Sequence, residues 1–156
     1  MRWRILLAVV LAVPPIGAAN AQSVADTLAQ FGLIGRWAAD CSKPVSSDNY
    51  LMVYAATGAG EVSRTYYDAP GHIYNKYKIV SATRQGAGTL TYEQVWDFNG
   101  SPANIAADRM TVVLKMSDGK FQVVSSQGSD GSYFVKDRKF AGSGIESPRQ
   151  ARCADK

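Results

Sequence analysis

From about residue 35 onward the chain is a succession of short segments, each rich in β-branched and aromatic residues and each closed by a turn signal of Gly, Asp, Asn or Pro. The strongest of these signals, Asp118–Gly119, is typical of a tight hairpin between two alternating runs. Segments at this spacing pair with their neighbours along the chain. The pattern therefore predicts an all-β, antiparallel meander.

Eight strands are expected, at residues 35–41, 50–56, 61–67, 72–83, 89–98, 109–117, 120–126 and 132–136. Eight antiparallel strands with almost no helix form either a closed up-and-down barrel or a two-sheet sandwich. The chain shows no internal repeat and no linker, so residues 22–156 are expected to form a single β-barrel domain.

One short helix is predicted before the first strand, at residues 23–31. Val24, Leu28 and Phe31 recur there at helical spacing, Ser23 is a candidate cap, and Gly32 ends the segment. A helix of this length suits a lid or plug over the strands rather than a core element.

The first 21 residues have the three parts of a secretory signal peptide. Arg2 and Arg4 provide a positive start, residues 5–13 are apolar, and Ala19-Asn20-Ala21 offers small residues for cleavage. An apolar run of nine residues falls short of the about 20 that span a bilayer, so no membrane span is expected. No cysteine lies at the cleavage point, and Cys41 is too far downstream to be a lipidated first residue, so a Sec-type signal on a periplasmic or secreted protein is expected, and not a lipoprotein.

The charge of the mature chain does not favour nucleic acid as a partner. Removing Arg2 and Arg4 leaves 15 basic residues against 13 acidic ones, so the net charge falls from +4 to about +2. The densest basic runs, residues 136–139 and 149–152, are short and diluted by Asp137 and Gln150.

The two cysteines, Cys41 and Cys153, lie near the two ends of the expected domain. In an exported protein two such cysteines are expected to pair as a structural disulfide. A redox pair would need closer spacing, and a metal site would need more ligands than two thiols and one imidazole, so no metal is expected.

The alternation along two strands separates an apolar face from a polar one. Met110, Val112, Leu114 and Met116 share one face of their strand, which indicates a half-buried sheet. In the preceding strand Gln94 shares a face with Leu90, Tyr92, Trp96 and Phe98. Gln94 is expected to bond a backbone group, to lie near a strand end, or to contact a ligand inside a barrel.

The stretch from Phe31 to Trp37, a short helix that runs into Gly35-Arg36-Trp37 on the first strand, resembles the start of a lipocalin. This resemblance implies structural roles for Gly35 and Trp37 in an eight-stranded barrel. It also implies a basic residue packed across the tryptophan near the last strand, for which Arg138, Arg149 and Arg152 are the candidates.

If the chain is lipocalin-like, the resemblance implies that the barrel binds one small hydrophobic or amphipathic molecule. Tyrosine and tryptophan have large apolar bodies with one polar group, which suits such a cavity. The candidate lining residues are Tyr54, Tyr66, Tyr74, Tyr77, Tyr92, Gln94 and Trp96.

Motifs for catalysis are missing from the sequence. His72, the one histidine, lies beside a turn, and no serine lies in a Gly-x-Ser-x-Gly elbow. Glu93 and Asp97 would lie about 13 Å apart on one strand face, beyond the about 6.5–9.5 Å of an inverting glycosidase. No enzyme activity and no cofactor are therefore expected.

Two functions remain in different classes. The first is a ligand-binding module in the periplasm or outside the cell. The alternative is a protein-directed role, as a protease inhibitor or envelope partner, which would act through residues 22–30 or the long loop 99–108.

Overall fold

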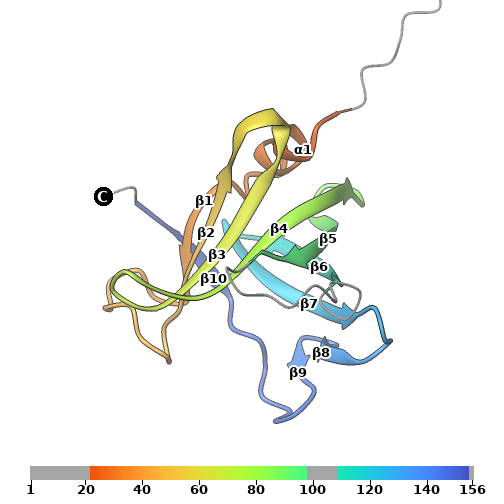
Figure 1. Ribbon diagram of the computed structural model, residues 1–156. Coiled ribbons are helices and arrows are strands. Elements are labelled where there is room, and N and C mark those ends of the chain that lie inside the picture. The colour runs from red at the N-terminus through yellow and green to blue at the C-terminus, as the bar shows by residue number, and fades with distance from the viewer. Residues whose placement is uncertain (1–21, 98–108, 155–156) are drawn as a thin grey trace, which may run out of the picture.

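The computed structural model describes residues 22–97 and 109–154, and within these ranges it is built mainly of antiparallel strands, with one short α-helix at one end (Figure 1). The predicted signal peptide, residue Phe98 and the loop 99–108 lie outside the described residues. No helix within the described ranges is long and apolar enough to cross a membrane.

The helix α1 spans Val24–Phe31 and the short 3-10 helix η1 spans Gly58–Gly60. The strands are β1 Gly35–Ala38, β2 Leu51–Ala56, β3 Val62–Ala69, β4 His72–Arg84, β5 Thr89–Trp96, β6 Arg109–Ser117, β7 Lys120–Gly128, β8 Tyr133–Lys136, β9 Lys139–Phe140 and β10 Gln150–Cys153.

Eight of these strands close into a barrel. This confirms the predicted barrel and excludes the alternative, a two-sheet sandwich. Strands β1 to β7 pair in chain order, and β10 pairs with both β7 and β1 to complete the ring. The prediction that residues 132–136 form the eighth barrel strand was wrong, because β8 and β9 extend from the barrel and β10 closes it. The four residues of β10 show too little alternation to predict a strand.

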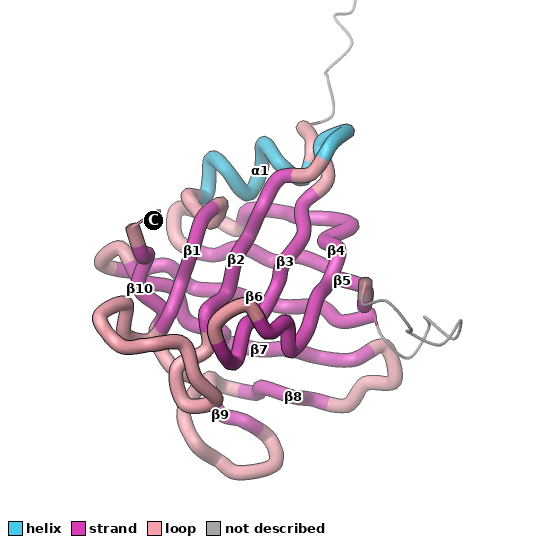
Figure 2. The backbone as a smooth tube through the Cα atoms, turned by 60° about the vertical axis from the view of Figure 1, so that its left-hand side comes forward, coloured by secondary structure: helices cyan, strands magenta, loops and turns pink. Residues whose placement is uncertain are grey.

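Strand β7 makes this arrangement possible because its free edge is divided between two partners. Its first residues, Lys120 and Phe121, pair with β10, while Ser126 and Gln127 near its end pair with β8. The chain between β8 and β10 is therefore carried outward from the barrel wall at one end (Figure 2).

Helix α1 forms where the sequence predicts it and covers one end of the barrel (Figure 2). The hydroxyl of Ser23 accepts a hydrogen bond of 3.1 Å from the backbone N–H of Asp26, and Gly32 ends the helix in the left-handed conformation. Leu28 and Phe31 are buried in the core beneath the helix, as expected of a plug.

The predicted apolar faces of β5 and β6 point into the barrel. Leu90, Tyr92 and Gln94 are buried on β5, and Val112 and Leu114 are buried on β6. The packed core fills the part of the barrel nearest α1, where Trp37, Phe121 and their neighbours contact one another.

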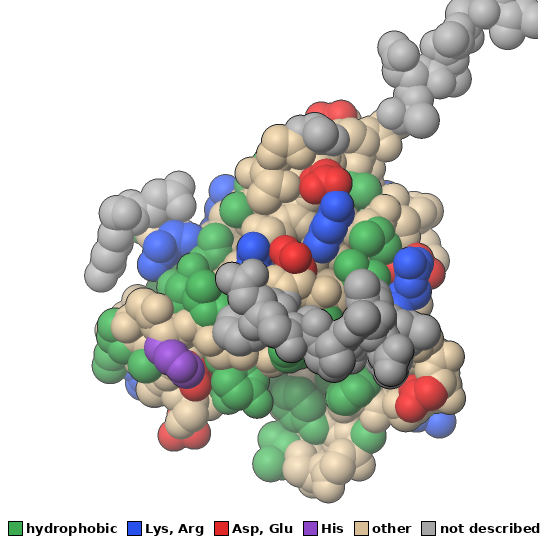
Figure 3. Space-filling model, in the orientation of Figure 1, with side chains coloured by type: hydrophobic (Ala, Val, Ile, Leu, Met, Phe, Trp, Pro, Cys, Tyr) green, Lys and Arg blue, Asp and Glu red, His purple; other side chains and the backbone are tan. Residues whose placement is uncertain are grey.

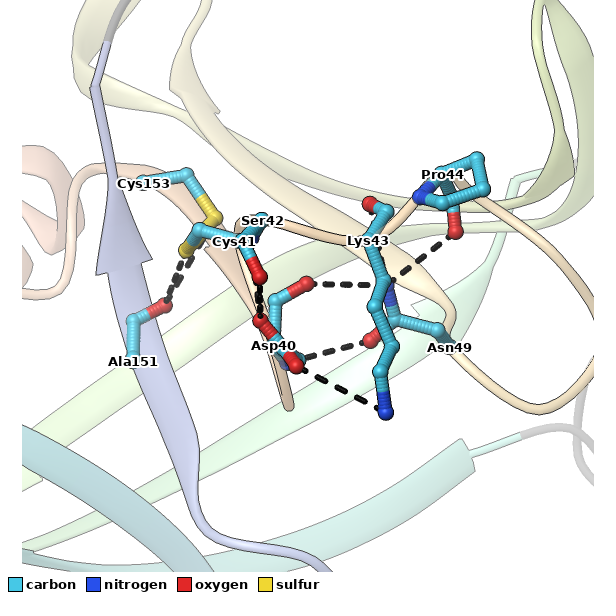
Figure 4. Close-up of a disulfide and its surroundings, with 8 residues drawn as sticks. All are labelled: Asp40, Cys41, Ser42, Lys43, Pro44, Asn49, Ala151 and Cys153. Carbon is cyan, nitrogen blue, oxygen red and sulfur yellow. Dashed lines mark hydrogen bonds and ion pairs between the residues drawn. A yellow bond between two sulfur atoms is a disulfide. The ribbon is translucent and has the colours of Figure 1, made fainter.

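The predicted disulfide joins Cys41 and Cys153, whose Cα atoms are 5.4 Å apart (Figure 4). It lies beside the seam between β1 and β10 that closes the ring. The neighbouring loop is tied down by Asn49, whose side-chain amide donates to the carbonyl of Asp40 at 2.9 Å and accepts from the backbone N–H of that residue at 3.1 Å.

Candidate functional site

The barrel holds a cavity of about 870 Å³ at the end opposite α1. One part of its lining comes from the first residues of β2, β4 and β6 and from the last residues of β3, β5 and β7. The other part comes from the chain that runs from β8 to β10. Drug-sized ligands occupy pockets of about 300–1,000 Å³. The cavity is therefore large enough for one small molecule.

The mouth of the cavity is aromatic and open to solvent. Tyr74, on β4, is 51% exposed, and Phe134, on β8, is 56% exposed, and both line the cavity. Tyr133 and Phe140 add two further exposed rings from β8 and β9. Hydrophobic side chains gather toward this end of the molecule (Figure 3).

Arg64 lies at the inner end of the cavity, where the side chain is only 3% exposed. Its position on β3 places it in register between Tyr54 of β2 and Tyr77 of β4. One terminal nitrogen, Nη1, donates to the hydroxyl of Tyr92 at 2.8 Å and to Oε1 of Gln94 at 3.0 Å.

The other two nitrogens of Arg64 are less completely hydrogen-bonded. Nη2 donates to the hydroxyl of Tyr66 and, at 3.7 Å, to the thioether sulfur of Met52, which is a weak acceptor. Nε is buried and has no hydrogen-bond partner within the described ranges. Among the described residues, the guanidinium thus contacts only uncharged groups.

Aromatic rings surround the same guanidinium. Its central carbon lies 4.5 Å from the ring centroid of Tyr66, 5.5 Å from that of Tyr54 and 5.9 Å from that of Tyr92. A desolvated cation–π contact contributes about 2 kcal/mol, whereas burial of an ion costs several kcal/mol. The three rings therefore offset much of the cost of burying this charge, but they do not neutralise it.

The charge states in this cluster follow from burial and from the neighbouring groups. Burial lowers the pKa of the Arg64 guanidinium, but the Tyr54, Tyr92 and Tyr77 phenols raise that pKa by more once they ionise at high pH, so Arg64 stays protonated. Burial raises the pKa of the Tyr54 and Tyr92 phenols, which are therefore neutral near pH 7. Neither phenol supplies a negative charge to Arg64.

Carboxylates are also missing from this cluster. No aspartate or glutamate in residues 22–97 or 109–154 is buried, and none of the described lining residues is acidic. Several described carboxylates form ion pairs on the surface instead, for example Glu93 with Arg109 at 3.0 Å and Asp97 with Lys76 at 3.3 Å. Arg64 is thus a buried cation without a described counter-ion.

The structure places five of the seven candidate lining residues at the cavity, namely Tyr66, Tyr74, Tyr77, Gln94 and Trp96. Tyr54 and Tyr92 do not line it. They lie deeper in the barrel, where their hydroxyls are 3.2 Å apart and Tyr92 accepts from Arg64. For Gln94, the partner is the Arg64 side chain and not a backbone group.

The sequence analysis missed Arg64, although the pattern held a signal for it. In β3 the residues Val62, Arg64 and Tyr66 alternate with Ser63 and Thr65. Because Tyr66 was expected to face the ligand, the period of two places Arg64 on the same inner face. An arginine between two inward apolar residues is the unusual feature that identifies the site.

Arg152, one of the three arginines considered as the partner of Trp37, lies beside Gly35 at the start of β1. A side chain at Gly35 would lie 3.2 Å from Nε of Arg152, and Trp37 pairs with Arg152 in register. Arg149 instead donates to the carbonyl of Ser117 at 3.1 Å. The indole N–H of Trp37 donates to the carbonyl of Leu33 at 2.8 Å.

The remaining candidate residues lie away from the cavity. His72 is 69% exposed and its Nδ1 lies 2.6 Å from a carboxylate oxygen of Asp68. Residues 24–30 belong to α1, which packs on the closed end of the barrel, and the loop 99–108 lies outside the described residues. No group of three or more metal-ligating side chains occurs within the described ranges.

Comparison of the chain with known protein-family models, curated proteins and solved structures finds no match. What the cavity can bind is therefore argued from its own side chains. They combine a long aromatic wall with a single buried cation.

Replacing Arg64 by Met together with Gln94 by Leu is expected to raise the free energy of unfolding by about 1–3 kcal/mol. Substituting buried charged groups by apolar ones of similar volume is often stabilising by this amount, and Tyr92 keeps its bond to Tyr54. Urea unfolding followed by circular dichroism measures the change. The matched control is Arg84→Met, at the exposed end of β4, with an expected change within about 0.5 kcal/mol. A marked loss in the double variant would show that the cluster holds the fold together.

Proposed function

We propose that this chain is a binding module that holds one small hydrophobic or amphipathic molecule inside its barrel. The observation that supports this proposal is the cavity of about 870 Å³, which opens through an aromatic mouth at the end opposite α1. A barrel whose purpose was structural alone would fill its interior with side chains, as eight strands permit.

The distribution of packing within the barrel favours binding. Near α1 the interior is solid, with Trp37, Phe121 and Leu114 fully buried. Toward the mouth the inward side chains are large, but they stand around a space instead of filling it. Tyr77 and Trp96, for example, stack edge to face along the wall, with ring centroids 5.2 Å apart. Rigid aromatic walls with few polar groups suit an apolar ligand.

The lipocalin-like arrangement belongs to the same proposal. Its support is the closed ring of eight strands, the short helix before β1, and the placement of Arg152 against Gly35. We also propose that residues 1–21 direct export and are removed, and that the protein works in the periplasm or outside the cell. The disulfide between Cys41 and Cys153 supports this, because such bonds persist in oxidising compartments.

The binding proposal is tested by filling the cavity. Ser126→Trp places a large ring in the cavity, because Ser126 is a buried lining residue of β7. Ser125→Trp is the matched control, since Ser125 is the adjacent residue and pairs with Val113 on the outer face. Native mass spectrometry of the protein, purified without detergent, measures any bound mass, and a fluorescent apolar probe measures capacity.

The expected result is that the wild-type protein and Ser125→Trp bind the probe equally, while Ser126→Trp binds it at least about tenfold more weakly, because an overfilled pocket loses its apolar contacts. Circular dichroism checks that both variants are folded. A wild-type protein that carries no mass and binds no apolar probe would overturn the proposed function, as would equal binding by the two variants.

A further inference from the structure

We propose that the molecule held in the barrel is an amphiphile with a single anionic head group of the carboxylate kind, and that this head group pairs with Arg64 at the inner end of the cavity. This inference rests on the proposed function. It adds the chemical class and the orientation of the ligand.

The first support is the uncompensated charge. Arg64 is the only buried charged residue within the described ranges, and no described carboxylate lines the cavity with it. Buried cations are normally paired, because desolvation without a counter-ion is unfavourable. An anionic ligand would supply the missing charge when it enters.

The second support is the donor set around Arg64. Nη1 uses both of its hydrogens on Tyr92 and Gln94, which fixes the plane of the guanidinium. Nη2 has only the Met52 sulfur and the Tyr66 hydroxyl, and Nε has no described partner. A carboxylate could replace the weak sulfur contact on Nη2 and accept from the Tyr66 hydroxyl as well, which gives a charge-assisted pair of bonds.

The number of charges limits the head group. The described lining contains one arginine and no lysine or histidine. A monoanion would be neutralised by this one cation, whereas a dianion such as a phosphate monoester would leave one negative charge buried. A carboxylate therefore fits better than a phosphate monoester.

The shape of the cavity sets the orientation. Arg64 lies deep, and between it and the solvent the described wall is mainly aromatic and aliphatic, with Tyr77, Trp96 and Val135 among its members. The exposed rings of Tyr74 and Phe134 stand at the mouth. The anionic head would thus lie inside, with the apolar tail along the wall and its end at the mouth.

The test compares four probes that each contain a twelve-carbon chain, namely dodecanoate, dodecan-1-ol, dodecyl phosphate and dodecyltrimethylammonium. Calorimetry at neutral pH measures the dissociation constants for the wild-type protein, below the critical micelle concentration of each ionic probe and below the solubility limit of the alcohol. We expect dodecanoate to bind roughly 10- to 100-fold more tightly than dodecan-1-ol, as is typical of a hydrogen bond to a charged group. The phosphate and the ammonium probes should bind more weakly than dodecanoate.

Three variants then test whether the preference for dodecanoate depends on Arg64. Arg64→Met should abolish the preference for dodecanoate while dodecan-1-ol still binds, and Arg64→Lys should retain a preference because it keeps the charge. Arg84→Met, the matched control at the exposed end of β4, should behave as wild type. Circular dichroism confirms folding, and the four-probe comparison on the wild-type protein stands even where a variant fails to fold.

The outcomes distinguish a failure of this inference from a failure of the proposed binding function. If the alcohol binds as tightly as the carboxylate, or if Arg64→Met keeps the preference, the anionic head group is overturned and the binding barrel stands. If dodecyl phosphate binds more tightly than dodecanoate, the conclusion that the head group carries a single negative charge is overturned. If no probe binds, the proposed function itself fails.

Discussion

Replacing Cys41 and Cys153 by serine is expected to lower the free energy of unfolding by about 4–5 kcal/mol, the largest effect of any change to the closing seam. The two residues are 112 positions apart in sequence. A cross-link across so long a loop removes much of the conformational entropy of the unfolded chain, which is the main source of its stabilising effect in the chain-entropy model.

The structure gives this disulfide a second role in the folded state. Strand β10 has only four residues, and it must pair with both β1 and β7 to close the ring. Cys153 itself pairs with Arg36 of β1, so the covalent bond holds β10 in register at the seam. Without the bond, β10 is the strand that we expect to leave first.

Urea unfolding of the double variant, followed by circular dichroism, measures this loss. The wild-type protein in reducing buffer should show the same loss, and the double variant should not respond to the reductant, which separates the bond from any effect of serine. Hydrogen exchange should show faster exchange in β10 and β1 of the variant. A loss below about 1 kcal/mol would contradict the prediction and indicate that the reduced chain keeps its ends together.

Much of this fold could be predicted because its signals are local. All eight predicted strands, which correspond to β1–β8, and α1 lie close to their expected positions, since turn residues such as Asp118–Gly119 and the cap at Ser23 act on their immediate neighbours. The inward face of β6 was predicted for the same reason, because a period of two is visible within the strand itself.

Closure of the barrel depends on contacts that the chain order does not reveal. Strand β10 is too short to show alternation, and its partners β1 and β7 are both distant from it in sequence. The sequence-based prediction took the strand at residues 132–136, the next one along the chain after β7, as the strand that closes the barrel. In the structure, closure falls instead to the segment that the disulfide at Cys153 brings to β1.

The aromatic wall of the candidate site could be predicted from the sequence, but its buried cation, Arg64, could not. Aromatic side chains on inner faces identified most of the wall, including Tyr66, Tyr77 and Trp96. Arg64 was passed over because arginine is usually exposed, and its burial depends on Tyr92 and Gln94, which come from β5, two strands away. Only the three-dimensional arrangement shows that these uncharged groups hold it.

Trp37→Ala is expected to lower the free energy of unfolding by about 3–5 kcal/mol, because it removes a buried indole and leaves a cavity in a part of the barrel that is otherwise solid. The ring of Trp37 stacks edge to face on Phe121, with centroids 4.9 Å apart, and its N–H bonds the carbonyl of Leu33 at 2.8 Å. The side chain therefore joins β1, β7 and the end of α1.

Trp96→Ala is the matched control, because it makes the same change at the other described tryptophan. Trp96 is half-buried and already lines a cavity, so its loss should cost only about 1–2 kcal/mol. It should weaken ligand binding, however, whereas folded Trp37→Ala protein should bind as wild type. The two variants should thus separate stability from binding along one barrel.

Trp37→Phe keeps the measurement informative if the alanine variant does not fold. It preserves a ring against Phe121 but leaves the carbonyl of Leu33 without its donor, so we expect an intermediate loss of about 1–3 kcal/mol. Urea unfolding of the three variants gives the order of stability. Equal losses at Trp37 and Trp96 would contradict the division of the barrel into a packed end and a binding end, since that division requires a ring beneath α1 to contribute more to stability than a ring at the cavity.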